Sequence, residues 1–177
     1  MLKFSPRTYF LLGALFCLSL ILAALYFQFQ GGLEPCPLCI SQRIMVVAVG
    51  LVLLAAVLHN PDRVGIRTYA IAGFVAAMIG AGISGRHVWI QHLPADEVPA
   101  CGPGLSYMFQ YFPLSNTLRA MLTGTGDCAK VDWTLFGLSM PAWVLICFLG
   151  LGGLSLAQFW NPAGRRCEPA SGFREKS

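Results

Sequence analysis

The segment TYFLLGALFCLSLILAALYF, residues 8–27, contains no charged side chain in 20 consecutive positions. A helix of about 20 apolar residues crosses the ~30 Å hydrocarbon core of a bilayer. Three more charge-free segments follow, at residues 44–60, 68–85 and 133–160. Hydrophobic residues make up 56% of the 177 residues and charged residues 11%, whereas about 25% of residues are charged in soluble domains. We therefore predict an all-α integral membrane protein, a single membrane domain over residues 1–177 built as a four-transmembrane-helix bundle.

The expected spans cover residues 8–27, 38–59, 68–86 and 140–160. The second must begin before Ile44, because the apolar run from there to Leu58 would rise only ~22 Å at ~1.5 Å per residue. The first follows two basic residues, as a signal peptide does. It is longer than the ~7–15 residues of a secretory apolar region and lacks a small-residue cleavage site, so we expect a retained anchor. In the third span, small residues recur every fourth position (Gly73, Ala77, Ala81, Gly85) and favour close helix packing.

Basic residues predict the orientation of the bundle. Eight of the twelve Lys and Arg residues lie at the N-terminus, between the second and third spans, or in the tail at 161–177 (Lys3, Arg7, Arg63, Arg67, Arg165, Arg166, Arg174, Lys176). By the positive-inside rule, both termini are cytoplasmic, and the loops at about 28–37 and 87–139 lie outside. The net charge of +4 is scattered rather than clustered, which argues against nucleic acid as a partner.

Topology divides the seven cysteines into two groups. Cys17 and Cys147 fall within spans and Cys167 falls in the cytoplasmic tail, where thiols stay reduced, so we expect no redox role for these three. The remaining four lie in the two outward loops (Cys36, Cys39, Cys101, Cys128).

Cys36 and Cys39 form a Cys-x-x-Cys pair at the expected start of the second span. Pro37 favours the first helical position, and a helix N-terminus lowers the pKa of such thiols. Arg43 lies on the same helical face as both cysteines, so we expect its cation to face the thiols. A charge this close to hydrocarbon usually marks function.

Cys101 and Cys128 stand in glycine-rich sequence, which indicates a loop able to move. Between them Leu105, Met108, Phe109 and Phe112 have helical spacing. This spacing fits either a short helix lying on the membrane or a small packed loop core.

Four outer cysteines admit three interpretations. Structural disulfides are common outside the cytoplasm, but a Cys-x-x-Cys bridge closes too small a loop to stabilise much. A Cys₄ zinc site is formally adequate, yet two isolated cysteines match zinc knuckles poorly, and we predict no metal ligands. Covalent haem attachment fails because Ile40 stands where histidine would follow the pair. The third interpretation, a relay of two exchanging disulfides, meets the needs of thiol–disulfide exchange. Without a flavin, haem or nucleotide motif, such a relay would use a membrane quinone.

The segment CPLCISQR at residues 36–43 resembles the Cys-x-x-Cys-x-x-x-Arg signature of the disulfide bond formation protein B (DsbB) family. GDCA at residues 126–129, followed by Trp133, Gly137-Leu138 and Met140-Pro141-x-Trp143, is similar to that family's run from the last cysteine into the fourth span. The resemblance covers residues from about 8 to 160. It implies a quinone-dependent protein-disulfide oxidoreductase of the bacterial inner membrane, with its redox cysteines in periplasmic loops.

The resemblance also implies partners and residue roles. The enzyme would reoxidise a periplasmic DsbA-like thioredoxin-fold oxidase and pass the electrons to ubiquinone, or to menaquinone without oxygen. Cys101 would form the mixed disulfide with the partner, and the released Cys128 would attack Cys36. Cys39 would then face the quinone as a thiolate. The quinone-binding residues would be Arg43, His87 and Gln91.

Two alternatives remain open at this point. One is a non-catalytic membrane scaffold, either disulfide-stapled or zinc-binding. The other is the vitamin K epoxide reductase family, whose active Cys-x-x-Cys lies on a late span, whereas this one opens the second.

Overall fold

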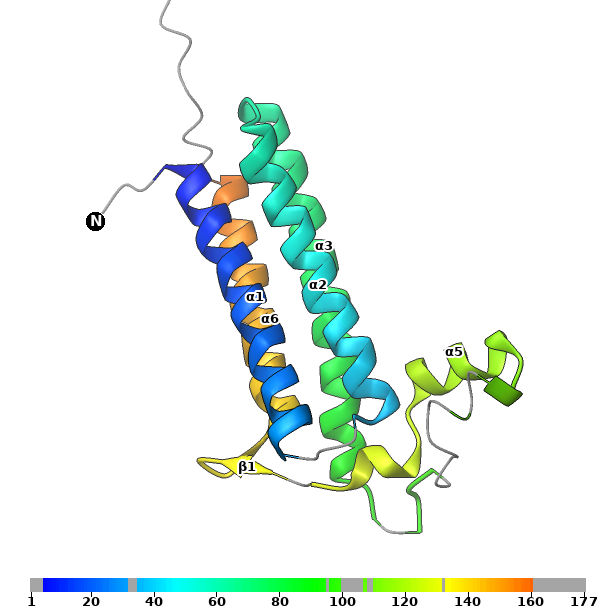
Figure 1. Cartoon of the computed structure of the whole chain (residues 1–177). Helices are drawn as coiled ribbons and strands as arrows, with labels where there is room; N and C mark the ends of the chain where they lie inside the picture. Colours follow the sequence, from blue (N-terminus) through cyan, green and yellow to red (C-terminus); the bar gives the residue numbers. More distant parts are fainter. Residues whose placement is uncertain are drawn as a thin grey trace, which may run out of the picture.

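The computed structural model of the chain describes residues 5–31, 35–94, 96–99, 107, 110–131 and 133–160. This part of the chain contains four long helices: α1 (Pro6–Gly31), α2 (Pro37–His59), α3 (Arg63–Gln91) and α6 (Met140–Trp160). Between α3 and α6 lie a shorter helix α5 (Leu114–Thr123), a 3₁₀ turn η1 (Gly126–Ala129) and an antiparallel hairpin of β1 (Thr134–Leu135) and β2 (Leu138–Ser139). In Figure 1 the long helices run side by side, with α5, η1 and the hairpin at one end of the bundle. We refer to this end as the loop end.

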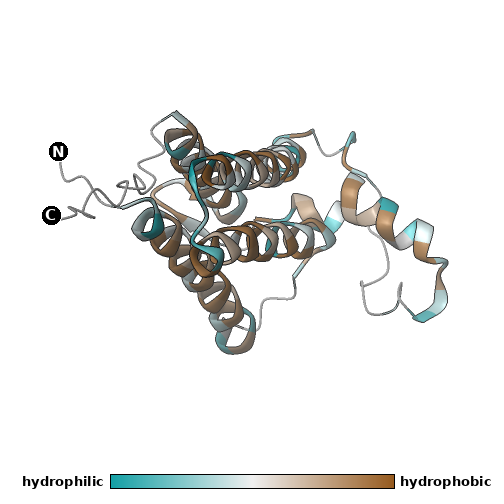
Figure 2. Ribbon diagram, turned by 90° about the horizontal axis from the view of Figure 1, so that it is seen from above, coloured by the Kyte–Doolittle hydropathy of each residue, from teal (hydrophilic) through white to brown (hydrophobic). Residues whose placement is uncertain are grey.

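The four long helices are apolar and long enough to cross a membrane, which confirms the predicted four-helix architecture. α1 packs on α2, α2 on α3, and α3 on α6, whereas α1 and α6 touch little. Hydrophobic residues cover the outside of the bundle (Figure 2), among them Leu12, Leu22, Leu51, Ile71 and Leu149. Such a continuous apolar surface needs lipid rather than water around it.

The turn between α2 and α3 lies opposite the loop end, together with the start of α1 and the end of α6 (Figure 1). α2 ends at His59 and is capped by Asn60, whose left-handed backbone (φ 44°) asparagine tolerates well. α3 begins after Asp62, whose carboxylate accepts a hydrogen bond from the backbone N–H of Gly65 at 3.0 Å. The chain thus crosses the bundle four times and returns to the end at which it started.

Small residues bring α3 and α6 together. Gly73 and Ala77 are buried, as their place in the predicted small-residue stripe requires. Gly85, which ends that stripe, faces open space instead. Gly80, outside the stripe, packs against Phe148: a Cβ there would lie 2.4 Å from the ring. A repeat of four residues drifts around a helix of 3.6 residues per turn, so Gly85 leaves the interface, whereas Gly80 lies in it.

Helix α3 is longer than the predicted third span at 68–86. Its 29 residues rise ~44 Å at ~1.5 Å per residue, more than the ~30 Å hydrocarbon core requires. The additional turns place His87 and Gln91 on the helix itself, at the loop end, rather than in the following loop.

The loop end contains one helix that the sequence pattern did not predict. The segment at residues 105–112, for which the sequence allowed either a short helix on the membrane or a small packed loop core, lies mostly outside the described residues. Helix α5 begins just beyond it, behind Pro113, and projects sideways from the bundle (Figures 1 and 2). Its apolar positions Leu114, Leu118 and Met121 recur at helical spacing.

Candidate active site

Cys36 caps the start of α2. Its Sγ accepts a hydrogen bond from the backbone N–H of Cys39 at 3.3 Å. Its backbone is extended, as in most helix N-caps, and Pro37 follows at the first helical position, where a missing N–H is tolerated. The helix start therefore fixes this sulfur at the loop end.

Cys39 lies one turn further along the same helix. Its Sγ is 3.0 Å from that of Cys36, and both side chains are half-buried. A disulfide requires an S–S distance of about 2.05 Å, so a small movement of either sulfur joins them. The predicted Cys-x-x-Cys pair is thus in position to exchange between dithiol and disulfide.

Cys128 reaches the same place from η1. Its side chain is fully buried and packs against Leu38 of α2 and Ile90 of α3. Its Sγ lies within 4.8 Å of both the Cys36 sulfur and a ligand nitrogen of His87. Cys36 therefore lies close to Cys39 of its own helix and to Cys128 of a distant segment.

Two side chains fix the segment that carries Cys128. Ser41 of α2 donates through its Oγ to the carbonyl of Met121 at 2.7 Å, and Arg86 of α3 donates through Nε to the carbonyl of Thr123 at 2.9 Å. Both acceptors belong to the last turn of α5, whose carbonyls lack partners within the helix. The C-terminus of α5 is thereby held against α2 and α3, five residues before Cys128.

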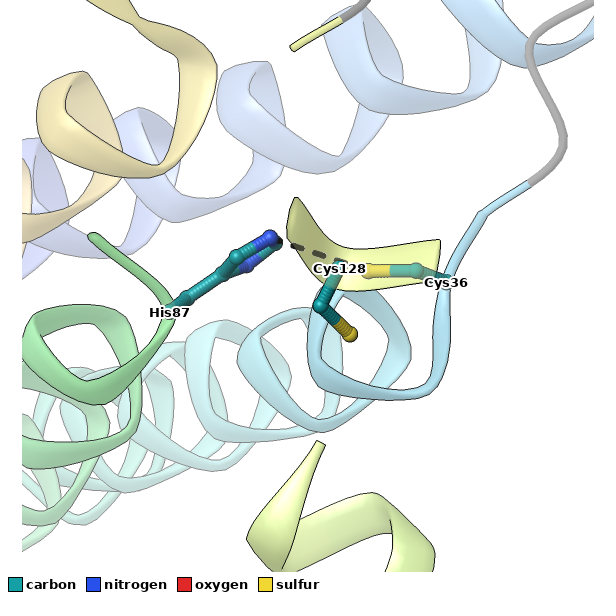
Figure 3. A group of neighbouring side chains, drawn as sticks. All are labelled: Cys36, His87 and Cys128. Atoms are coloured by element: carbon teal, nitrogen blue, oxygen red, sulfur yellow. Dashed lines mark hydrogen bonds between the residues drawn. The ribbon is translucent and has the colours of Figure 1, made fainter. Parts of the chain in front are cut away.

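His87 approaches this cluster from α3, with its ring directed toward Cys36 (Figure 3). Only 2% of its surface is exposed, its Nε2 lies 3.8 Å from the Cys36 sulfur, and its Nδ1 lies 3.0 Å from Nε2 of the buried Gln42. An amide N–H donating to Nδ1 leaves the imidazole proton on Nε2. In this arrangement the imidazole directs an N–H toward the sulfur of Cys36.

Among the described residues, the two thiols outside the spans, Cys36 and Cys128, are less acidic than an ordinary thiol. The pKa of Cys128 is raised, first by its interaction with Cys36 and then by burial. Interaction with Cys128 lowers the pKa of Cys36, but contact with Cys39 and burial outweigh it and raise this pKa to about 12. The sequence predicted a lowered pKa for Cys36 at the helix start. That prediction was wrong for the reduced site, because neighbouring thiols cannot all ionise in one poorly solvated cluster.

Arg43 points elsewhere than the sequence predicted. Its guanidinium donates to the side-chain oxygen of Gln28 and, at 3.2 Å, to the carbonyl of Ala24, both on α1. The long side chain lets a residue on the Cys39 face reach the neighbouring helix. Gln91 accepts a hydrogen bond from Ser139 of β2 at 2.7 Å, so it joins α3 to the hairpin.

Comparison with known proteins shows the family of this chain. The family described as "Disulfide bond formation protein DsbB" matches residues 6–158. The chain belongs to the DsbB family. It is 73% identical over 157 residues to disulfide bond formation protein B of Methylococcus capsulatus, a match covering 89% of this chain and 96% of the relative. Identity to the protein of the same name from Nitrosococcus oceani is 52% over 163 residues, or 92% and 96% of the two chains.

Membership in the DsbB family decides between the alternatives that the sequence left open. The chain is a disulfide-generating oxidoreductase and a multi-pass protein of the bacterial inner membrane. A scaffold without turnover and the vitamin K epoxide reductase family are both set aside. The DsbB family generally uses quinone and acts with DsbA partners.

The predicted site residues divide into three groups. Cys36, Cys39, Cys128 and His87 meet at the loop end, whereas Arg43 and Gln91 point to neighbouring elements. Cys101 lies outside the described residues. Of the three cysteines for which no redox role was expected, Cys17 and Cys147 lie on α1 and α6, and Cys167 lies outside the described residues.

Sequence reasoning missed Gln42, Ser41 and Arg86. A signal existed for Gln42, because a glutamine three residues after Cys39, at the edge of an apolar span, shares the helical face of the thiols. Ser41 and Arg86 carry no such signal. Both bind backbone carbonyls of α5, and no side-chain pattern reveals a carbonyl partner.

Proposed function

We propose that this DsbB-family protein reoxidises a DsbA-like thioredoxin-fold oxidase of the periplasm and passes the electron pair to membrane quinone. The observation that supports this most directly is the place of Cys36, whose sulfur is near those of both Cys39 and Cys128. One sulfur that can pair with either of two neighbours is what a chain of disulfide exchanges requires.

The exchange begins with disulfides Cys101–Cys128 and Cys36–Cys39. A partner thiolate attacks Cys101, forms the mixed disulfide and releases Cys128 as a thiolate. Cys128 then attacks Cys36, so that the Cys36–Cys128 bond forms, the Cys36–Cys39 bond breaks and Cys39 leaves with the electron pair. The contact between Cys128 and Cys36 favours this direction of attack over one at Cys39.

The remaining steps of the cycle restore both disulfides. The partner's second thiol displaces Cys101 and leaves with its own disulfide. Cys101 then attacks Cys128, whose bond to Cys36 breaks. Cys36 and Cys39 are left as a dithiol that has gained two electrons and two protons, and their oxidation regenerates the starting enzyme.

The residues beside Cys39 fit a quinone by their chemistry. A bound quinone, ubiquinone or menaquinone, supplies an acceptor for two electrons and two protons. Arg43 holds a permanent positive charge one helical turn from Cys39, and its hydrogen bond to Gln28 holds the guanidinium in place. His87 and Gln91 provide polar groups on the facing turns of α3. These residues would bind the ring oxygens and balance the negative charge on Cys39.

We also propose that the loop end faces the periplasm. Both termini would then be cytoplasmic, as the distribution of basic residues favours. A membrane-impermeant thiol reagent applied to intact spheroplasts should label Cys36 after reduction. Labelling that requires permeabilised membranes would reverse this orientation.

The function is tested with the full chain in detergent, a reduced thioredoxin-fold partner and a soluble ubiquinone. We expect one quinone consumed for each partner disulfide formed. Arg43→Ala should raise the quinone concentration needed for half-maximal rate at least ~10-fold if a charge-assisted contact of ~1.5–3 kcal/mol is lost. Cys147→Ser, remote in sequence from both pairs, should turn over normally. Absence of quinone consumption by the wild-type chain would refute the proposal.

A further inference from the structure

Two sulfurs and one imidazole converge at the loop end from three separate elements. The donor atoms of Cys36, His87 and Cys128 all lie within 4.8 Å of one another, and Figure 3 shows the His87 ring directed toward Cys36, with Cys128 beside that pair. We propose that the fully reduced protein binds one Zn²⁺ through these three residues, and that the bound ion blocks disulfide exchange. Zinc binding itself does not depend on the proposed electron route; only the inhibition rests on it.

The donor set suits zinc. Thiolate sulfur and imidazole nitrogen are the ligands of most protein zinc sites, at about 2.3 Å and 2.0–2.1 Å. Two ligands of a tetrahedral ion at those lengths stand ~3.5–3.8 Å apart. The Cys36 sulfur and His87 Nε2 are already 3.8 Å apart. To complete the three-ligand site around an ion, the Cys128 sulfur therefore has to move by only ~1 Å.

Charge balance favours binding at this depth. Two thiols release two protons on binding, and two thiolates with a neutral imidazole leave no net charge around Zn²⁺. His87 and Cys128 are almost completely buried, where an unbalanced charge would be costly. Exchange between disulfides needs only the sulfurs, so the buried imidazole beside them is a third donor that exchange does not require.

Gln42 provides the outer support that zinc-binding histidines usually have. Its amide nitrogen lies 3.0 Å from Nδ1 of His87. Turned over, the same amide presents its oxygen, which accepts a hydrogen bond from the Nδ1–H group and leaves the Nε2 lone pair free for a metal. A glutamine at this position can therefore form a hydrogen bond with either tautomer of the His87 imidazole.

The site exists only when both sulfurs are free. A disulfide at Cys36 or at Cys128 removes a ligand, so zinc binds the reduced enzyme and not the oxidised one. Cys39 is not one of the three donors. The bound ion occupies the two sulfurs between which the exchange bond must form, and turnover stops until it leaves.

Binding is measured on the full chain in detergent, without quinone or partner, after reduction by a phosphine. We expect one Zn²⁺ per reduced chain and none per oxidised chain. X-ray absorption of the wild-type zinc complex should show sulfur and nitrogen neighbours, with two sulfurs. His87→Gln, Cys36→Ser and Cys128→Ser should each weaken binding by at least ~10-fold, the lower end of losses known for groups supporting a metal.

Two variants separate this site from other thiol sites. Cys147→Ser is the matched control for losing a thiol, and Cys39→Ser tests the Cys-x-x-Cys pair as a rival site; both should still bind one ion. Unchanged affinity in His87→Gln, loss of binding in Cys39→Ser, or equal binding by the oxidised chain would overturn the proposal.

Turnover provides the second measurement. Zn²⁺ should inhibit quinone consumption, and a chelator should restore it. A chain that binds zinc but never reduces quinone would refute the proposed function alone. A chain that turns over but binds no zinc would refute this inference alone.

Discussion

At the scale of single residues, Gly124 decides whether Cys128 can reach Cys36. Its backbone (φ 81°, ψ 162°) lies in a region that glycine alone adopts readily. A Cβ there would stand 2.7 Å from Ile90 Cδ1 and 2.8 Å from Leu38 Cδ1. These two side chains also pack on Cys128. The turn at Gly124 and the side chain of Cys128 therefore pack against the same two residues.

Gly124→Ala should destabilise the loop end by about 2–4 kcal/mol, the sum of a strained backbone and an overpacked contact. Gly137, at φ 78° with nothing within 4 Å of its Cβ position, is the matched control. Gly137→Ala should cost only the backbone part, about 1–2 kcal/mol. Thermal unfolding of both variants in detergent measures the difference, and equal losses would contradict the packing account.

The raised pKa of Cys36 predicts how its reactivity depends on pH. With a pKa of about 12, this thiol is protonated at neutral pH, and its thiolate fraction rises about tenfold per pH unit. Alkylation of Cys36 in the reduced protein, followed by mass spectrometry of its peptide, should rise throughout pH 7 to 10. In the denatured chain the rate should level off near pH 9. A plateau below pH 8 in the folded protein would contradict the raised pKa.

At the scale of elements, α5 functions as the support for η1. The hydrogen bond from Ser41 to the carbonyl of Met121 attaches it to α2, and the one from Arg86 to the carbonyl of Thr123 attaches it to α3. Neither attachment follows from the sequence, because each depends on a backbone carbonyl brought close by the fold. The spans are different: their apolar pattern is local, so four helices could be predicted within a few residues.

Ser41→Ala should loosen this support by about 1–3 kcal/mol, because a buried carbonyl loses its partner. The consequence is slower formation of the Cys36–Cys128 disulfide. Thr123→Ala is the matched control, since Thr123 donates to the Arg119 carbonyl within α5 itself and is exposed. Quenched-flow trapping measures both rates. Equal rates in the two variants would show that Ser41 does not position η1.

At the scale of the whole molecule, the bundle brings sulfurs together that are far apart in the chain. The position of Cys36 and Cys39 at a helix start could be predicted from Pro37 alone. Their contact with Cys128 follows from no local pattern, because it depends on how a long loop folds over the ends of α2 and α3; only the family resemblance implied it. The direction of Arg43 was also beyond prediction, since its long side chain selects a partner on another helix.

The account's central claim is that Cys128 exchanges with Cys36. The most direct test is a variant carrying Cys39→Ser and Cys101→Ser, which leaves only these two sulfurs of the four. After mild oxidation in detergent, digestion and mass spectrometry should recover Cys36 and Cys128 in one disulfide-linked peptide pair, in nearly all molecules. Recovery of both cysteines as free thiols, or of either joined to another cysteine, would contradict the claim.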